Sequence, residues 1–216
     1  KFVDDRDAGE MLDLFRKVAA SGKQLALMAH FSHPRELESD VVKQAIYNLR
    51  EAGVVIRTQS PVMRNINDDP EVWAKMWEEQ VKLGCMPYYM FLARDTGAQH
   101  YFSVPLVRAW KIFREAYQQV SGLARTVRGP SMSANPGKVQ VLGVSEVAGK
   151  EVLVMRFLQG RNPDWVQRPF FAEYSDTACW LDELKPAFGE AKFFFENEME
   201  NLYHEKNDTS TADDFE

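Results

Sequence analysis

The feature that most constrains the fold is a threefold alternation of strand-like and helix-like segments over the first 120 residues. Short, mostly apolar runs predict strands at 25–31, 54–62 and 85–92, the first of them apolar enough to be covered on both faces. Apolar residues at helical spacing predict helices at 7–21, 39–52, 70–83 and 106–120. Three β-α units in series predict a parallel α/β sheet, because parallel neighbours need helical crossovers. Three strands cannot close a barrel, so we expect further strands from upstream or from a partner chain.

The character of the sequence changes after Gly122, where glycine and proline cluster in RGPSMSANPGK. Two alternating runs that meet near 147–150 predict an antiparallel hairpin, and WVQRPFFAEYS predicts a third short strand. We expect helices at 180–184 and 191–202. The domain boundaries that follow are 1–122, 123–205 and a disordered acidic tail at 206–216.

Bulk composition excludes several classes of protein. A net charge of -6 argues against a nucleic-acid binder, which needs a basic surface. No apolar run reaches the roughly 18 residues that span a membrane, and the first ten residues lack the apolar core of a signal peptide, so we expect a cytoplasmic protein. Cys85 and Cys179 are too far apart in sequence for a CxxC site, and we interpret both as small apolar residues.

Polar side chains gather where the three predicted strands end, and in parallel α/β folds ligands bind at such ends. These residues are His30 and His33 after the first strand, Arg57 and Gln59 in the second, and Tyr88, Tyr89, Arg94 and Asp95 in or after the third. The sequence leaves other roles open for them. The two histidines could belong to a loop that hydrogen-bonds to itself, the tyrosines could simply pack, and Arg94 could pair with Asp95. The two histidines alone do not predict a metal site, since no third ligand is near.

Lys138 follows Asn-Pro-Gly at the end of the segment of small residues. Such a segment allows a backbone to approach a ligand closely, and its amides favour an anion. A lysine there could hold a phosphate or form a Schiff base, and the alternative is a turn lysine in water.

Six motifs occur in order between Gln24 and Phe171 and together resemble the lysine 2,3-aminomutase family. They are HFSHP, RTQSPVMRNIND, MPYYMF, DTGAQHYF, VSGLARTVRGPS and NPGK. The resemblance implies the last three β-α units of a partial TIM-type (βα)6 radical SAM barrel, followed by a small α+β segment that carries the pyridoxal-phosphate lysine. It also implies a homo-oligomer.

The same resemblance implies an isomerase, an amino-acid 2,3-aminomutase. In this family a [4Fe-4S] cluster cleaves S-adenosylmethionine to start radical chemistry, and an α-amino group held on pyridoxal 5'-phosphate migrates to the β-carbon. Lys138 would be the catalytic residue that forms the Schiff base with pyridoxal phosphate. His30 and Gln59 would lie near S-adenosylmethionine, and Tyr88 and Tyr89 would line the mouth of the barrel.

Two departures from the family pattern matter. The cluster motif CxxxCxxC is absent, so we expect no metal ligands in this chain and no activity from it alone. Arg94, or Asp95 beside it, and Ser131 stand where the lysine enzyme has substrate-binding aspartates. An arginine facing the substrate would repel lysine and favour an acidic or neutral amino acid. The alternative functions are a non-catalytic half-barrel that binds a partner, and a pyridoxal-phosphate enzyme without radical chemistry.

Overall fold

The computed structural model describes residues 2–3, 6–93 and 97–202. The chain forms two compact units, of which unit 1 is Lys1–Val104 with Arg108–Ser131 and unit 2 is Pro105–Val107 with Met132–Glu216. The expected disordered tail at 206–216 lies outside the described residues. Among the described helices, none combines the length and the apolar character that crossing a membrane requires.

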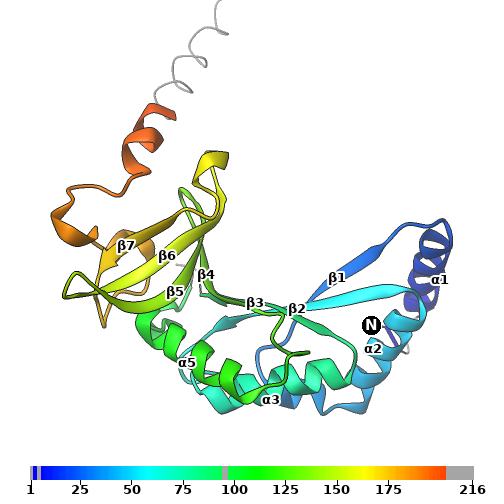
Figure 1. Ribbon diagram of the computed structural model, residues 1–216. Coiled ribbons are helices and arrows are strands. Elements are labelled where there is room, and N and C mark those ends of the chain that lie inside the picture. Colours follow the sequence, from blue (N-terminus) through cyan, green and yellow to red (C-terminus); the bar gives the residue numbers. More distant parts are fainter. Residues whose placement is uncertain (1, 4–5, 94–96, 203–216) are drawn as a thin grey trace, which may run out of the picture. The chain divides into compact units, whose positions relative to one another are not determined.

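Unit 1 alternates strands and helices as the sequence predicts. Its elements are α1 (Arg6–Ala20), β1 (Leu25–His30), η1 (Pro34–Leu37), α2 (Asp40–Glu51), β2 (Val54–Val62), α3 (Pro70–Lys82), β3 (Met86–Leu92), α4 (Gln99–Phe102), α5 (Leu106–Gln119) and β4 (Arg128–Ala134), the last two lying partly in unit 2. Strands β1 to β4 pair in parallel, in chain order. Helices α1, α2 and α3 lie on one face of β1, β2 and β3 and leave the opposite face open (Figure 1).

Alternation along β2 explains how the covered face is built. Val54, Ile56 and Val62 are buried, and so are Thr58 and Ser60, whereas the residues between them are half-buried or exposed. Helix α3 packs the indoles of Trp73 and Trp77 there, at ring centroids 5.6 Å apart. The Thr58 hydroxyl donates to the Gln80 side chain at 2.6 Å, so the buried polar groups of strand and helix satisfy each other.

Strand β1 differs from its expected environment. Its run is almost wholly apolar, but Ala26 and Met28 on its open face are exposed in the described chain. The expectation of cover on both faces is therefore not met by this chain's own residues.

Strand β4 was not predicted from the sequence, where only a cluster of glycine and proline was noted in this segment. Arg128–Ala134 is a strand, registered with β3 through the pairs Tyr89↔Arg128 and Phe91↔Ser131. Pro130 has no backbone N–H to donate, but it lies between the paired residues, and there it costs the ladder little. The glycine and proline in this segment are disfavoured in strands, and for this reason the sequence did not predict β4, which forms only two registered pairs with β3.

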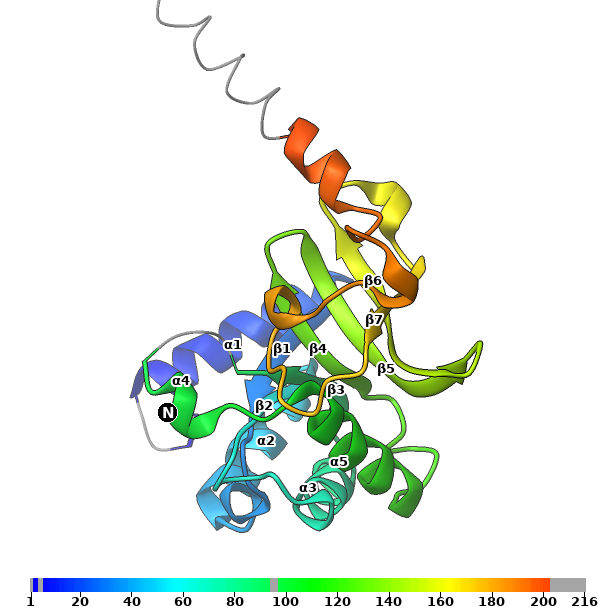
Figure 2. The same cartoon turned by 90° about the vertical axis from the view of Figure 1, so that its left-hand side faces the viewer.

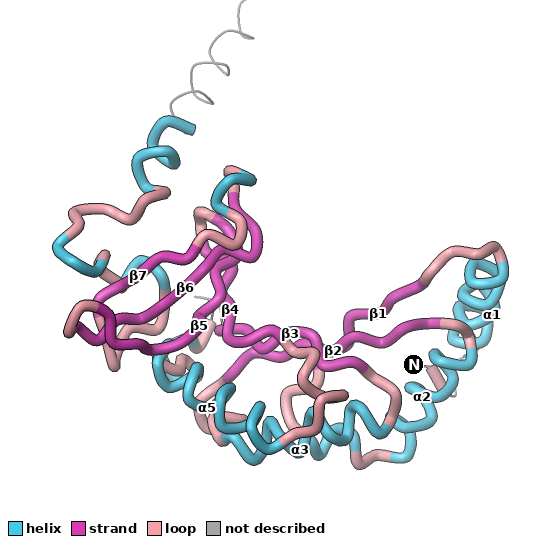
Figure 3. Tube along the Cα trace, in the orientation of Figure 1, coloured by secondary structure: helices cyan, strands magenta, loops and turns pink. Residues whose placement is uncertain are grey.

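Unit 2 is built on the predicted hairpin. Its elements are β5 (Gly137–Val147), β6 (Lys150–Gly160), η2 (Pro163–Trp165), β7 (Pro169–Glu173), η3 (Leu181–Glu183) and η4 (Ala187–Gly189), all drawn in Figure 3. β5, β6 and β7 pair antiparallel, so the strands form one mixed seven-stranded sheet in the order β1 to β7. Ala148 and Gly149 connect β5 to β6 with positive φ values of 52° and 74°, as a type I′ turn requires.

An aromatic cluster forms the core of unit 2. The Phe157 ring lies 5.4 Å from Phe170, 5.2 Å from Phe195 and 5.6 Å from Trp165, measured between ring centroids. The Glu198 carboxylate accepts from the Trp165 indole at 2.8 Å and ties the last described helix to this core. Figure 2 draws this last described helix in orange-red.

Two helices expected in this half are shorter than predicted. The segment 180–184 contains only the single 3-10 turn η3, and the segment 191–202 is helical only at 196–202. Phe193 and Phe195 use their rings to fill the core instead of continuing a helix. The Phe193 N–H donates to the Glu196 carboxylate at 2.7 Å, which satisfies a backbone donor just before the helix begins.

Candidate functional site

Four side chains form a row across the open face of unit 1. The register pairs His30 with Gln59, Gln59 with Tyr89, and Tyr89 with Arg128, so β1 to β4 each contribute one residue. Gln59 Nε2 lies 2.7 Å from His30 Nε2, and the amide can donate to that ring nitrogen when it is unprotonated. We call these four residues the open-face row. The sequence analysis placed three of them in one site and missed Arg128.

An irregularity in β3 brings a second tyrosine to the same place. The register steps from Thr58↔Pro87 to Gln59↔Tyr89, so Tyr88 is an extra residue in β3. Such a bulge re-aims side chains. The Tyr88 and Tyr89 rings meet edge to face at 4.5 Å, and the Arg128 guanidinium lies 4.9 Å and 5.2 Å from their respective centroids.

Arg57 completes this group. Its guanidinium carbon lies 4.8 Å from the Tyr88 centroid, and Arg128 Nη1 donates to the Tyr89 hydroxyl at 2.6 Å. We call Arg57, Tyr88, Tyr89 and Arg128 the arginine–tyrosine cluster. The tyrosines do pack, as one reading of the sequence allowed, but they pack against two cations.

His33 does not join the row. Its Nδ1 accepts from the Arg35 N–H at 3.2 Å, and the Glu36 carboxylate accepts from the Ser32 and His33 N–H groups at 2.7 Å and 2.9 Å. This is a capping box around η1. For His33, the alternative of a loop that hydrogen-bonds to itself is therefore confirmed.

Asn67 organises the loops that follow β1 and β2, and the sequence analysis did not single it out. Its amide group donates to the Ser32 carbonyl at 2.9 Å and to the Pro61 carbonyl at 3.0 Å, and its Oδ1 accepts from the Met63 N–H at 2.7 Å. The side chain is 1% exposed. One buried amide thus connects the strand ends that carry His30 and Gln59. The motif RTQSPVMRNIND contains this residue but gives no sign of its role.

We expect Asn67→Ala to destabilise the chain by about 3 kcal/mol, because it removes the partners of three backbone groups that water reaches poorly. Urea denaturation of this variant and of Asn197→Ala, an exposed position, measures the difference. Equal midpoints for the two variants would contradict the role given to Asn67.

Lys138 is held at the start of β5 by a constrained turn. Gly137 has φ 148°, and a Cβ there would collide with the Gln159 carbonyl oxygen and the Gly160 Cα. Arg161 fixes the preceding residues, because its Nε donates to the Asn135 carbonyl at 2.7 Å and its N–H donates to the Pro136 carbonyl at 3.0 Å. Lys138 itself is half-buried. The backbone before this lysine is therefore defined by sterics and hydrogen bonds.

The remaining predicted residues are distributed as follows. Ser131 is buried, and its hydroxyl donates to the Met90 carbonyl at 3.4 Å. Arg94 and Asp95 lie outside the described residues. Lys138 belongs to unit 2 and Gln59 to unit 1, so the expected approach of Lys138 to the strand ends stays a prediction.

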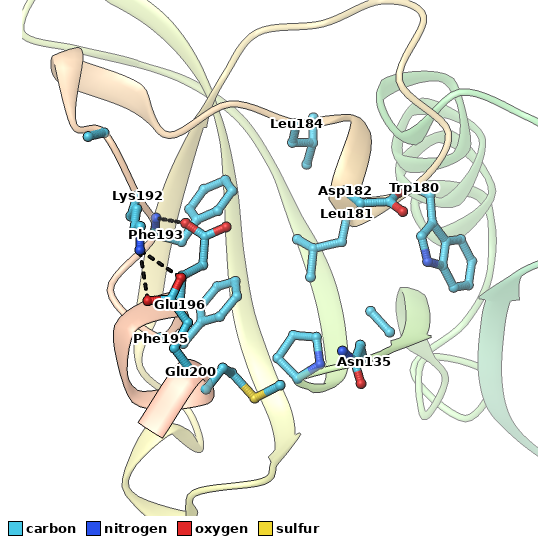
Figure 4. Close-up of a pocket in the computed structure, with 14 residues that line it drawn as sticks. Asn135, Trp180, Leu181, Asp182, Leu184, Lys192, Phe193, Phe195, Glu196 and Glu200 are labelled. Atoms are coloured by element: carbon cyan, nitrogen blue, oxygen red, sulfur yellow. Dashed lines mark hydrogen bonds and ion pairs between the residues drawn. The ribbon is translucent and has the colours of Figure 1, made fainter. Parts of the chain in front are cut away.

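A pocket of about 510 Å³ lies within unit 2 (Figure 4). Asn135 and Pro136, the residues before the Gly137–Lys138 turn, form part of its wall, and Leu181 and Phe195 are among its apolar lining residues. Lys192 pairs with Glu200 at 2.7 Å, as the dashed lines in Figure 4 mark. The sequence analysis did not foresee this pocket, because its wall comes from segments distant in sequence.

The described residues contain no group of three or more histidine, cysteine, aspartate or glutamate side chains that could hold a metal ion. Burial raises the pKa of the Cys85 thiol to about 11, against a smaller opposing effect of Arg50. That thiol stays protonated near neutral pH, so it is poorly suited to bind iron. Cys179, the only other cysteine, cannot complete a cluster ligand set with it.

Comparison with known proteins gives a consistent set of relatives. The chain is 30% identical over 192 residues to a protein of Aquifex aeolicus named "Putative L-lysine 2,3-aminomutase", a match that covers 89% of this chain and 49% of the relative. It is 35% identical over 117 residues to the L-lysine 2,3-aminomutase of Escherichia coli, covering 51% of this chain and 34% of that protein. It is 26% identical over 133 residues to the glutamate 2,3-aminomutase of Clostridioides difficile, covering 61% of this chain and 31% of that protein.

The chain thus spans about half the length, or less, of these curated relatives. No family model matches it. Among solved structures, a radical SAM methyltransferase from Sphaerobacter thermophilus aligns with 56% of this chain and 38% of its own at a TM-score of 0.39 and 16% identity, a likeness too low to carry an argument.

Proposed function

Because this chain belongs by sequence to the lysine/glutamate 2,3-aminomutase family of the radical SAM superfamily, we propose that it is the cofactor-lysine portion of an amino-acid 2,3-aminomutase. The whole protein would be an isomerase that moves an α-amino group to the β-carbon. Unit 1 would be the last three β-α units of a partial (βα)6 barrel with β4 beside them. We keep residues 1–122 as the proposed barrel part and residues 123–205 as the proposed segment that carries the cofactor lysine. A cytoplasmic location and self-association remain predictions.

The observation that carries this proposal is the open-face row. Four parallel strands present His30, Gln59, Tyr89 and Arg128 in register on a face that α1 to α3 do not cover. In α/β barrels the ligand sites lie at the carboxyl ends of the strands, and His30 is the last residue of β1. The exposed Ala26 and Met28 on the same face support the proposal that further barrel strands enclose it in the whole protein.

The residues around Lys138 fit pyridoxal phosphate. The turn before it admits only glycine at 137, because the β6 backbone at Gln159 and Gly160 occupies the space of a side chain, and this fixes the path of the chain into Lys138. The hydrogen bonds from Arg161 hold Asn135 and Pro136 in place, so the lysine amine starts from a fixed backbone. Bound pyridoxal phosphate supplies an aldehyde that captures amines and a ring that spreads unpaired spin.

Within this proposal each residue has a limited task. Lys138 holds the cofactor through its ε-nitrogen between turnovers. His30 and Gln59, already hydrogen-bonded to each other, orient S-adenosylmethionine. Tyr88 and Tyr89 bind the cofactors at the mouth of the barrel, and Arg94 or Asp95 binds the substrate. Ser131 reaches the substrate only if its buried hydroxyl leaves the Met90 carbonyl. The charge of Arg94 favours an acidic or neutral substrate side chain over lysine.

The chain does not fit an iron–sulfur cluster. Its sequence has two cysteines, one of them buried with a raised pKa, whereas a site-differentiated cluster needs three thiolates. The cluster would therefore be held by residues outside this chain, and we propose that the chain alone has no aminomutase activity. The same shortage of ligands favours a second candidate function, a non-catalytic half-barrel that binds a partner.

Reductive trapping tests the proposal. Borohydride reduction of the chain incubated with pyridoxal phosphate is expected to leave the pyridoxyl mass on the peptide that contains Lys138. Peptide mass spectrometry measures this, with the exposed Lys150 at the other end of the hairpin as an internal comparison. Equal labelling of both lysines would count against the aminomutase and favour the non-catalytic half-barrel.

A further inference from the structure

We propose that the arginine–tyrosine cluster is a binding site for a small oxyanion, a carboxylate or a phosphate. The site consists of the Arg57 and Arg128 guanidinium groups around the Tyr88 ring, with Tyr89 orienting Arg128. This site goes beyond the role given to Lys138, and the family resemblance assigns a ligand role to neither arginine.

The two cations share one aromatic neighbour, the Tyr88 ring. Each guanidinium carbon lies within 5 Å of the same ring centroid, at 4.8 Å and 4.9 Å, so the two cannot lie farther apart than the sum of these distances. The upper limit of that separation is about one Debye length at 0.1 M salt, so salt screens part of the repulsion between the two charges. An anion that contacts both would relieve the repulsion.

No acidic residue of the surrounding strands offsets these charges. The segments LALMAH, VVIRTQSPV, MPYYMFL and RGPSMSA of β1 to β4 contain two arginines and one histidine but no aspartate or glutamate. Across the described residues neither Arg57 nor Arg128 forms an ion pair. The four strands thus contribute basic but no acidic side chains to the sheet.

The geometry of Arg128 favours a specific ligand over a diffuse ion cloud. One of its N–H groups donates to the Tyr89 hydroxyl at 2.6 Å, which fixes the plane of the guanidinium and leaves other N–H groups available. Arginine recognises carboxylate and phosphate through two parallel hydrogen bonds, and stacking on an aromatic ring keeps one of its faces from water. These contacts preorganise the site before any ligand arrives.

Two sources could supply the oxyanion: the carboxylate of an acidic amino acid, or the phosphate of a cofactor. NMR of the arginine Nε–Hε resonances in the 216-residue chain separates them, using inorganic phosphate and L-glutamate as probes at constant ionic strength. The resonances are assigned by their loss in Arg57→Lys and Arg128→Lys. We expect saturable shifts of both resonances, with tighter binding of L-glutamate if the site takes a substrate carboxylate and of phosphate if it takes a cofactor phosphate.

Substitutions complete the test. Arg57→Gln and Arg128→Gln are each expected to weaken binding of the tighter probe at least tenfold. Arg16→Gln makes the same change of charge on α1, where the arginine pairs with Asp13, and should change binding less than twofold. The proposal is overturned if neither anion gives a saturable shift, or if both cluster variants bind like the wild-type chain. The NMR readout needs no pyridoxal phosphate, so a negative result would leave the proposal for Lys138 standing. A negative result in the borohydride experiment would likewise leave the anion site standing.

Discussion

Alanine at position 138 is expected to reduce the amount of pyridoxyl label fixed by borohydride by at least about tenfold, to the background of surface lysines. The ε-amine is the only group at this position that can attack the cofactor aldehyde. Arginine at 138 keeps the positive charge but is not expected to restore labelling, because a guanidinium does not form a stable link to an aldehyde. Spectrophotometry before reduction and mass spectrometry after it measure the loss.

The matched control is Lys150→Ala, at the first residue of β6. It removes one lysine from the same hairpin and should leave labelling at 138 unchanged. Both variants should keep their free energy of unfolding within about 1 kcal/mol of the wild-type value, as expected for substitutions away from the core. Full labelling of the Lys138→Ala variant would refute the assignment of this lysine.

Gly137→Ala is expected to cost more than about 3 kcal/mol of folding free energy, because a methyl group there meets backbone atoms that cannot rotate away. The Gln159 carbonyl and the Gly160 Cα belong to β6, so relief requires the start of the hairpin to separate. Urea denaturation monitored by tryptophan fluorescence reports the change, since Trp165 packs beside Phe157, which belongs to β6 as Gln159 and Gly160 do.

Gly149→Ala separates the effect of sterics from that of the dihedral angle. Gly149 has φ 74° but nothing within 4 Å of the added methyl group, so only the penalty for a left-handed residue applies, about 1–2 kcal/mol. If the two substitutions cost the same, the close approach of β5 and β6 at Gly137 does not matter. A large loss confined to Gly137→Ala would explain why the residue before Lys138 is glycine.

Much of unit 1 could be predicted from periodicity. The strand at Val54–Val62 has the predicted bounds, and the helix predicted at 70–83 is α3, which begins at Pro70 with Asp69 as its N-cap. These features are local, because apolar spacing and capping chemistry operate within a few residues. The hairpin of unit 2 could be predicted for the same reason, since its alternating apolar and polar residues and its tight turn lie within one short stretch.

Features that depend on register between strands could not be predicted in the same way. The residues next to Arg128 in sequence do not predict that it aligns with Tyr89, Gln59 and His30. The register between neighbouring strands determines that alignment. The hydrogen bonds of Asn67 join loops that are 35 residues apart in sequence. The phenylalanines that shorten the last helix contact β6 and β7, and helical spacing alone does not anticipate such contacts.

The alternation of β2 has a consequence for how such a protein could change its specificity. Val54, Ile56 and Val62 secure the strand to its helices, while Arg57 and Gln59 on the other side contribute nothing to that packing. Mutations at the second set can reverse the sign of the charge on the open face while the packed interior stays as it is. If that face binds the ligands proposed above, stability and ligand preference can evolve on independent positions of a single nine-residue strand.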